Sequence, residues 1–267
     1  MSKTIGIIGG GNMGRAIMAG LIKAQLYPAD AVLVYDLNPA ALTTLQTELG
    51  VQPMNSAAEL VATADVVVIA VKPQVIDRVL TPLRASFRAE QLLISIAAGV
   101  TLAHLGTVLD PKLKLVRVMP NTPALVGAGM AGVAVNSQVT AAEQATVLAI
   151  FNSFGRAQLV PEDLIDAVVG LSGSGPAYVY LFLEALADGA VAEGMPRQLA
   201  YEFAAQTVYG AAKMVLSTEE HPGVLKDMVC SPGGTTIAAV EVLEEHAFRG
   251  IVMAAVHAAT EKNRQLG

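Results

Sequence analysis

The chain has a single cysteine, no tryptophan and few charged residues. With Cys230 alone, no disulfide can form within the chain, and no cluster of cysteine and histidine has the spacing of a metal site. Lysine and arginine number 17 against 23 aspartate and glutamate, which gives a net charge of −6. Nonspecific nucleic-acid binding needs clustered basic residues. We therefore expect neither a bound metal nor a nucleic-acid partner.

Long uninterrupted apolar runs are also missing. The longest, residues 177–192, contains Glu184 and Asp188, so it is too short and too charged to be predicted as a membrane span. The first residues run directly into a predicted strand without a signal-peptide pattern. We expect a cytoplasmic protein that does not enter a membrane.

The chain is instead rich in aliphatic residues. Hydrophobic residues make up 53% of its 267 positions, whereas charged residues make up 15%. This length allows one large domain or two of medium size. A chain with so little surface charge often covers part of itself in an oligomer, because subunit interfaces resemble the core of a domain. The composition therefore favours a homo-oligomer with an aliphatic core.

The first half of the chain alternates β-rich runs with helical segments. Such alternation predicts βαβ units and a parallel sheet. The predicted strands cover residues 4–8, 31–35, 65–71, 92–97, 114–118, 132–135 and 157–160. The predicted helices cover residues 13–24, 39–49, 75–83, 102–109 and 141–154.

After Pro161 the β-rich runs stop, and proline and glycine mark the ends of helices. The predicted helices cover residues 162–172, 176–193, 197–216, 222–229, 235–246 and 248–265. The sequence thus predicts an α/β protein with a Rossmann-type dinucleotide-binding domain over residues 1–160. A helical domain is expected over residues 161–267.

A glycine motif of the form G-x-G-x-x-G follows the first predicted strand and opens the first helix. Gly9 permits a tight turn, Gly11 lets the backbone reach a pyrophosphate, and Gly14 lets helix and strand pack closely. Asn12 and Met13 lie between the last two glycines and are candidate cofactor contacts. The alternative is a glycine-rich turn that binds nothing.

Asp36 ends the second predicted strand, about 20 residues beyond the motif. An acid at this place usually accepts hydrogen bonds from the adenosine ribose and repels a 2′-phosphate. Asn38 offers a donor to such a phosphate. These residues favour NADH and leave NADPH possible. The alternative is that Asp36 only caps the helix beginning at Pro39.

Small and polar residues follow the ends of three further strands, where open α/β sheets bind ligands. Lys72 offers a donor to ribose or phosphate, small residues suit a flat nicotinamide, and Asn121 offers an amide to the cofactor or the substrate. The alternatives are a solvated lysine and an ordinary turn. The candidate cofactor contacts here are Ala70, Val71, Lys72, Pro73, Ala97, Ala98 and Asn121.

Residues 231–236 place hydroxyl side chains on both sides of a Pro-Gly-Gly turn, ahead of a predicted helix. A helix start carries unpaired N–H groups and a partial positive charge. Glycine lets a ligand approach that backbone without a Cβ in the way. The segment predicts a pocket for a small anion, best a carboxylate, although a capped turn is the alternative. A nucleotide site and a small-acid site together suggest a reductase.

Two other functions fit part of this pattern. A β-hydroxyacid dehydrogenase shares the two-part layout but relies on a lysine in its helical domain, and no lysine occurs between Lys114 and Lys213. A non-catalytic NAD(P)-sensing protein keeps the glycine motif but needs no carboxylate pocket. The segment 173–176 is a second candidate anion site, for which we favour a capped helix start instead.

The chain resembles the pyrroline-5-carboxylate reductase family along essentially its whole length. The segments that carry the resemblance are 6–14, 70–73, 95–99, 119–123, 173–176 and, most specifically, 226–236. The last reads Lys-Asp-Met-Val-Cys-Ser-Pro-Gly-Gly-Thr-Thr. The resemblance implies reduction of the cyclic imine 1-pyrroline-5-carboxylate to L-proline by NAD(P)H, the last step of proline biosynthesis.

The resemblance also implies site residues and an assembly. The helical domain would intertwine with that of a second subunit in a homodimer, and dimers would build rings up to decamers. Thr236 would also donate to the ring nitrogen, and Glu219 matches an acid near the pocket. Many members prefer NADPH and have a neutral residue in place of Asp36, so the cofactor preference stays open. The residues that would hold the substrate carboxylate are Ser231, Gly233, Gly234 and Thr236.

Overall fold

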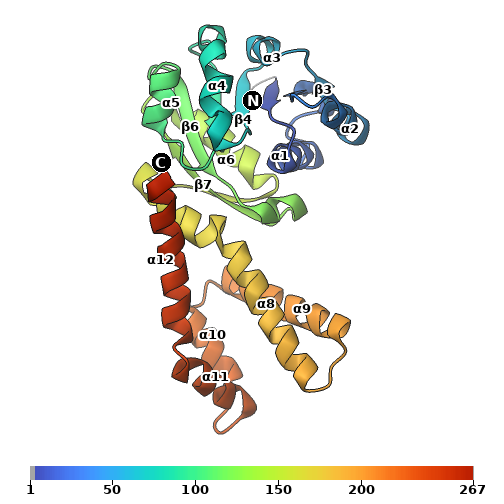
Figure 1. Cartoon of the computed structure of the whole chain (residues 1–267), viewed down its shortest axis with the longest axis vertical. Coiled ribbons are helices and arrows are strands. Elements are labelled where there is room, and N and C mark those ends of the chain that lie inside the picture. Colours follow the sequence, from blue (N-terminus) through green and yellow to red (C-terminus); the bar gives the residue numbers. More distant parts are fainter. Residues whose placement is uncertain (1–3, 267) are drawn as a thin grey trace. The chain divides into compact units, whose positions relative to one another are not determined.

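The structure, a computed structural model, describes residues 4–266. Within these residues the chain forms one twisted sheet with the strand order β3-β2-β1-β4-β5-β6-β7-β8, followed by a run of helices (Figure 1). The predicted order of an α/β portion and a helical portion is confirmed. The strands are β1 (Ile5–Ile8), β2 (Val32–Tyr35), β3 (Gln52–Pro53), β4 (Val66–Ile69), β5 (Leu92–Ser95), β6 (Lys114–Met119), β7 (Gly129–Val135) and β8 (Gly155–Leu159).

Strands β1 to β6 are parallel, and the strand order reverses at β1, which lies between β2 and β4. In open α/β sheets the crevice at the carboxyl ends of two such strands is where ligands bind. The segments that follow β1 and β4 are the glycine motif and residues 70–73. The topology therefore brings two of the predicted cofactor segments to one crevice.

The last two strands run in the opposite direction. β7 pairs antiparallel with β6, and β8 pairs parallel with β7, so the prediction of an all-parallel sheet is wrong for these strands. Only residues 120–128 connect β6 to β7. A parallel crossover needs about a dozen residues or more, usually including a helix. The short connection therefore forces an antiparallel return.

Helices cover both faces of the sheet. One core cluster packs β1 residues Ile5 and Ile7 with Ile17 of α1, and the other packs Ile8 with Leu60 of α3. The two clusters follow from the alternation of side chains along a strand. The short elements α3 and β3 were not predicted. The helices here are α1 (Asn12–Lys23), α2 (Pro39–Leu49), α3 (Ala57–Thr63), α4 (Ile76–Leu80), α5 (Leu102–Val108) and α6 (Ala141–Asn152).

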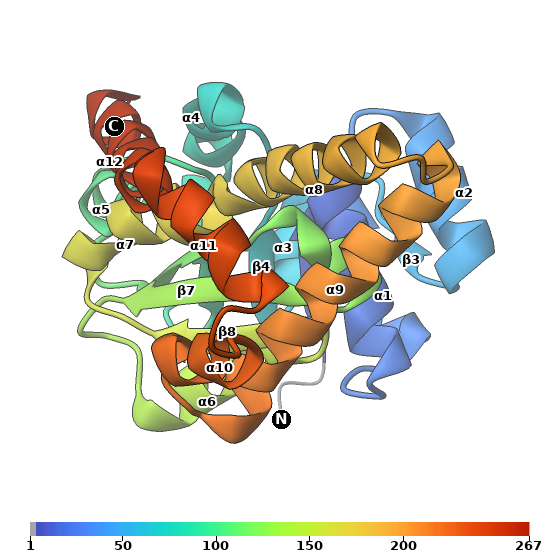
Figure 2. The same ribbon diagram turned by 90° about the horizontal axis from the view of Figure 1, so that it is seen from below.

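The remaining helices match the predicted ranges closely. Figure 2 shows α8 and α9 running beside each other as a hairpin, and the short α10 leading into α11. Gly194, in the turn of the hairpin, has φ +95°, a conformation that suits glycine. The helices are α7 (Ile165–Val168), α8 (Gly175–Ala192), α9 (Arg197–Thr218), α10 (Pro222–Val229), α11 (Thr235–Glu245) and α12 (Phe248–Leu266).

The chain divides into two compact units. The first, here called the sheet unit, consists of the residues up to Ser174 and the residues from Ala258 onward. The second, here called the helical unit, is Gly175–His257. The division differs from the predicted boundary between residues 160 and 161, because residues 162–174 pack with the sheet.

Two contacts show why those residues belong to the sheet unit. Ile165 is 1% exposed and lies in the same core cluster as Leu115 of β6. Asp166 accepts a hydrogen bond from Nδ2 of Asn263, at 2.8 Å, near the end of α12. The sequence becomes helical at residue 162, but the helical turns of residues 162–174 belong to the sheet unit. The last turns of α12 belong to it as well.

The predicted break at residues 173–176 is not a loop. A π-helical turn, Val169–Gly173, connects α7 to α8, and Ser174 N donates to Val169 O at 2.8 Å. Pro176 is the second residue of α8, as expected for proline near a helix start. Among the described residues, one helical stretch, Glu162–Ala192, is long and apolar enough by length and composition alone to cross a bilayer.

The helical unit has almost no core of its own. Its buried side chains are those of Ala187, Ala200 and Ala204. Large apolar side chains are exposed instead, among them Leu181, Phe203, Leu216, Met228, Val229, Ile251 and Met253. Exposed apolar surface on this scale is typical of an interaction surface.

Candidate cofactor and substrate sites

The glycine loop after β1 is tightly fixed by backbone contacts. Gly9 has φ +111°, and its N–H donates to Tyr35 O of β2 at 2.8 Å. A Cβ added to Gly9 would overlap the carbonyl oxygen of Ala70, and one added to Gly14 would overlap that of Gly9. Two of the three motif glycines are therefore required by the packing of strand, loop and helix.

Gly11 differs from the other two glycines. It is the N-cap residue of α1, and a Cβ added there would have no atom within 4 Å. No side chain caps α1, and its first turn contains no acidic residue. The N–H groups at the start of the helix, at Asn12 and Met13, thus have no side-chain acceptor competing for them. Such a helix start suits a phosphate or another anion.

Asp36 holds the glycine loop from the end of β2. Its Oδ2 accepts from Gly10 N at 2.7 Å, and its Oδ1 accepts from Asn38 N at 2.8 Å. Each carboxylate oxygen has a second lone pair for a ribose hydroxyl. The alternative that Asp36 caps α2 is wrong, because Oδ1 of Asn38 accepts from Ala40 N at 3.1 Å and fills that place.

The segments after β4 and β5 lie at the same edge of the sheet as the glycine loop, since these strands are parallel neighbours. Ala70 and Val71 are half-buried, and Pro73 opens a short 3₁₀ turn. Lys72 is exposed and forms no ion pair with any residue in 4–266. After β5, Ala97 is buried and Ala98 is exposed. The structure thus brings the predicted cofactor residues of three strands together.

Asn121 has a different environment from the one predicted. It is 9% exposed; its Nδ2 donates to Ser172 O at 3.0 Å, and its Oδ1 accepts from Met130 N at 2.9 Å. The side chain joins the end of β6 to β7 and to the π-helical turn. These bonds give Asn121 a scaffolding role within the sheet unit.

The loop of residues 231–236 forms a tight turn in the helical unit. Gly233 has φ +64°, and Gly234 N donates to Ser231 O at 3.0 Å, which is the pattern of a β-turn with glycine in the left-handed position. Gly234 is the N-cap residue of α11, and a Cβ there would overlap Ser231 Oγ. Helix α11 begins at Thr235, the start of the predicted range 235–246.

The start of α11 resembles that of α1 in having no cap. No side chain caps it, and its first turn has no acidic residue. Ser231 precedes this helix start and Thr236 lies in its first turn, so one short segment contains both hydroxyl and backbone donors. A carboxylate is the ligand that such donors prefer.

Two charged residues precede this loop in the sequence, and Glu219 is the one that the resemblance assigned to the pocket. Glu219 is exposed at the end of α9 with φ +58°, and no hydrogen bond joins it to residues 231–236 in the described chain. Lys226 lies 2.7 Å from Asp227, and this hydrogen-bonded carboxylate raises the pKa of Lys226. Lys226 therefore stays cationic at neutral pH.

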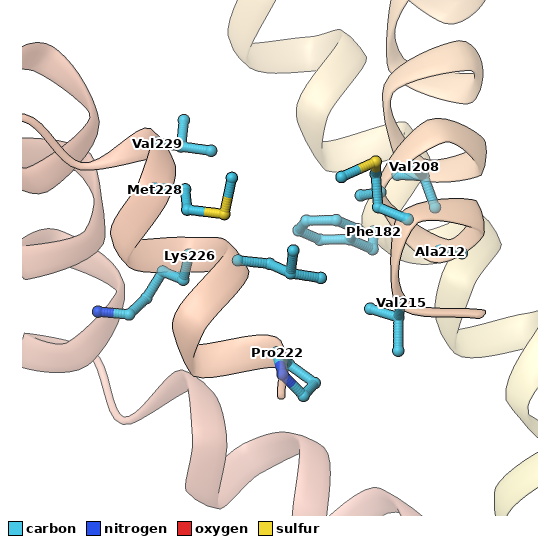
Figure 3. A pocket seen from close by; sticks show the side chains of 11 residues that line it. Phe182, Val208, Ala212, Val215, Pro222, Lys226, Met228 and Val229 are labelled. Atoms are coloured by element: carbon cyan, nitrogen blue, oxygen red, sulfur yellow. The ribbon is translucent and has the colours of Figure 1, made fainter. Parts of the chain in front are cut away.

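An apolar groove lies elsewhere in the helical unit (Figure 3). Figure 3 shows Phe182 of α8 and Val215 of α9 facing Pro222 of α10, while Lys226 points away from the groove. The lining offers no polar group inside the groove. It is therefore no candidate for the carboxylate site.

Sequence reasoning missed a charged cluster beside the loop that follows β5. Oε1 of Glu162 accepts from Leu102 N at 2.7 Å and lies 3.2 Å from Nη1 of Arg117. Arg117 is 5% exposed. These residues are 45 and 60 positions from Glu162 along the chain, so no local pattern relates them.

Family models cover most of the chain. Residues 162–266 match the model described as pyrroline-5-carboxylate reductase dimerisation. Residues 4–99 match the model described as NADP oxidoreductase, coenzyme F420-dependent. The first match begins next to the predicted boundary at Pro161.

The chain is also similar over its full length to known enzymes. It is 51% identical to the pyrroline-5-carboxylate reductase of Escherichia coli (strain K12), covering 100% of this chain and 99% of the relative. The solved pyrroline-5-carboxylate reductase of Coxiella burnetii has a TM-score of 0.95 and 37% identity, covering 100% and 99%. That of Plasmodium falciparum, solved with NADP bound, has a TM-score of 0.88 and 35% identity, covering 99% and 98%.

Proposed function

The chain belongs to the pyrroline-5-carboxylate reductase family, and we propose that its two compact units each hold one of the two reactants. It is an oxidoreductase of proline biosynthesis that reduces 1-pyrroline-5-carboxylate to L-proline with NAD(P)H. The proposal assigns the cofactor to the sheet unit and the substrate carboxylate to residues 231–236. The observation that carries it is a pair of uncapped, acid-free helix starts, α1 and α11.

In the cofactor site, the start of α1 binds the pyrophosphate, and Asp36 binds the adenosine ribose while holding Gly10. The residues after β4 and β5 flank the nicotinamide half. The proposed cofactor residues are Gly9, Gly11, Asn12, Met13, Gly14, Asp36, Asn38, Ala70, Val71, Lys72, Pro73, Ala97 and Ala98. Asn121, whose amide bonds to Ser172 and Met130, is proposed to support this site without contacting the cofactor.

In the substrate site, the N–H groups of the α11 start and the hydroxyl of Ser231 bind the carboxylate, and Gly233 and Gly234 keep side chains out of its way. When bound, the nicotinamide supplies a hydride to C5 of the imine, whose nitrogen is protonated. Before that proton arrives, Thr236 donates a hydrogen bond to the lone pair of the neutral imine nitrogen and so orients it. A threonine hydroxyl is too weak an acid at neutral pH to act as a general acid, so the proton comes from water. Most of the rate enhancement arises from holding the imine and the nicotinamide in the orientation that hydride transfer needs.

We also propose a homodimer formed through the helical unit, with larger rings built from dimers. The exposed apolar side chains of that unit support the dimer, as does the match to a dimerisation model. Glu219 would lie near the substrate in this assembly. A cytoplasmic location is proposed because a single cysteine gives no sign of an oxidising compartment. Light scattering coupled to size-exclusion chromatography measures the mass; a monomer would contradict the assembly.

The assay for this function follows the nicotinamide absorbance band. The purified chain is mixed with the five-membered imine and either NADH or NADPH, and oxidation of the cofactor is expected in both cases. The six-membered imine in the same assay measures the tolerance for ring size. If neither cofactor is oxidised in the presence of the five-membered imine, the reductase function is wrong for this chain.

Asp36→Ser is expected to raise the ratio of kcat/KM for NADPH to that for NADH, by about tenfold. The substitution removes the charge that repels a 2′-phosphate, and it also removes the acceptor for Gly10 N. Asp36→Asn is the matched control, because it removes the charge but keeps an oxygen for Gly10 N. Steady-state kinetics with both cofactors measure the ratio. If the ratio stays constant in both variants, Asp36 does not contact the ribose.

A further inference from the structure

We propose that Glu162 is a positioning residue for hydride transfer, because its carboxylate fixes the far end of the loop at residues 96–101. This inference rests on the proposed function, in which Ala97 and Ala98 lie beside the nicotinamide. Glu162 itself does not touch the reacting atoms. It acts through the first N–H group of α5, which follows this loop.

The contact with α5 is short and is made across a long stretch of sequence. Oε1 of Glu162 accepts from Leu102 N at 2.7 Å, and Leu102 is the first residue of α5. The N-cap residue Thr101 accepts from His104 N at 3.0 Å, so it leaves Leu102 N to Glu162. Glu162 therefore completes the N-terminal cap of α5, although it lies 60 residues further along the chain.

Arg117 fixes the carboxylate of Glu162 in turn. Its guanidinium is buried, with a side chain 6% exposed, and lies 3.2 Å from the same Oε1. Arginine is always charged in proteins, and a buried charge needs a partner. Arg264 does not compete for Glu162, since it pairs with Glu261 and Asp166. The Glu162 carboxylate is thus held by its ion pair with Arg117 as well as by the hydrogen bond from Leu102 N.

The same arginine is linked to the near end of the loop. Arg117 on β6 is in register with Ser95, the last residue of β5. Oγ of Ser95 accepts from Ala97 N at 3.3 Å. The loop of residues 96–101 is therefore held at one end by the β5–β6 pairing and at the other end by Glu162.

This geometry predicts which kinetic parameter changes. The adenosine and pyrophosphate halves of the cofactor bind at the glycine loop and Asp36, away from Glu162. Loss of Glu162 should therefore leave the affinity for NADH nearly intact while the nicotinamide sits less accurately. A displacement on the order of 1 Å at a reacting centre can reduce the rate about a hundredfold.

The experiment compares Glu162→Ala with Glu143→Ala in the full-length protein. Glu143 is a matched control: it pairs with Lys114 at 2.5 Å, caps a helix of the same unit, and has a comparably exposed side chain, 24% against 33%. It has no contact with the loop of residues 96–101. Glu162→Ala should lower kcat about tenfold or more, with a Kd for NADH within about twofold of wild type at full binding stoichiometry. Glu143→Ala should leave kcat within about twofold.

Two further readouts separate positioning from a general loss of structure. The primary deuterium isotope effect with C4-deuterated NADH should rise in Glu162→Ala, because hydride transfer becomes slower relative to the other steps. Glu162→Gln should recover most of kcat, since its amide oxygen still accepts from Leu102 N. Equal kcat in Glu162→Ala and Glu143→Ala would overturn the inference, as would a lower kcat with an unchanged isotope effect.

A second pair of variants keeps the test valid if Glu162→Ala fails to fold with Arg117 unpaired. Arg117→Met combined with Glu162→Gln removes both charges and keeps the acceptor for Leu102 N, whereas Arg117→Met combined with Glu162→Leu removes the acceptor too. The second double variant should have the lower kcat, and equal kcat would overturn the inference. A wild-type protein inactive on the imine would instead reject the proposed function.

Discussion

Gly14→Ala is expected to lower the melting temperature and to abolish detectable NADH binding. A Cβ at this position would overlap the carbonyl oxygen of Gly9, a residue whose N–H is fixed by donating to Tyr35 O. Helix α1 would have to move away from β1, and such overpacking costs about 1–3 kcal/mol or more. Circular dichroism measures the melting temperature, and NADH fluorescence measures binding.

Gly11→Ala is the matched comparison, because its Cβ would meet no protein atom within 4 Å. Its stability should stay within about 0.5 kcal/mol of wild type. The new methyl group would stand where the pyrophosphate approaches α1, so Kd for NADH should rise about tenfold or more. Wild-type affinity in Gly11→Ala would show that the pyrophosphate does not bind at this helix start. A wild-type melting temperature in Gly14→Ala would contradict the packing argument.

Thr236→Ala is expected to lower kcat about tenfold to a hundredfold with little change in KM for NADH. The hydroxyl lies in the first turn of α11, whose start is uncapped, and it is the proposed donor that orients the imine nitrogen. Loss of the donor affects the substrate ring and leaves the cofactor contacts, which belong to the sheet unit, in place. Steady-state kinetics with the imine and NADH as varied substrates measure the effect.

Thr235→Ala provides the control for this prediction. Thr235 is the same residue type at the preceding position of α11, and its side chain is exposed. Its loss should change kcat less than about threefold. Thr236→Ser should recover much of the activity, because serine keeps the hydroxyl. Unchanged kinetics in Thr236→Ala would remove the role assigned to this residue.

Features encoded by neighbouring residues were predictable from the sequence. The three motif glycines and the turn at Gly233 each depend on a few consecutive residues, and so do the ends of α8 and α9. Their backbone requirements are local, since a tight turn or a helix end needs particular residue types at particular places. The segments that form the two proposed sites could therefore be identified from the sequence.

Features that depend on contacts between distant residues were not predictable in this way. Nothing near Asn121 indicates that its amide will bond to Ser172 and Met130, and nothing near Glu162 indicates a contact with Leu102. The direction of β7 is an intermediate case. The short connection from β6 contains the information, because it leaves no room for a crossover helix, but the alternation of strands and helices obscures it.

The near absence of a core in the helical unit has a consequence for how the protein tolerates dilution. A unit whose buried side chains are alanines gains little folding free energy from one chain alone. Any stability supplied by contact with another copy follows mass action, so it falls as the protein concentration falls. The sheet unit, with two aliphatic clusters of its own, has no such dependence. Dilution should therefore loosen the proposed substrate site while the proposed nucleotide site stays folded.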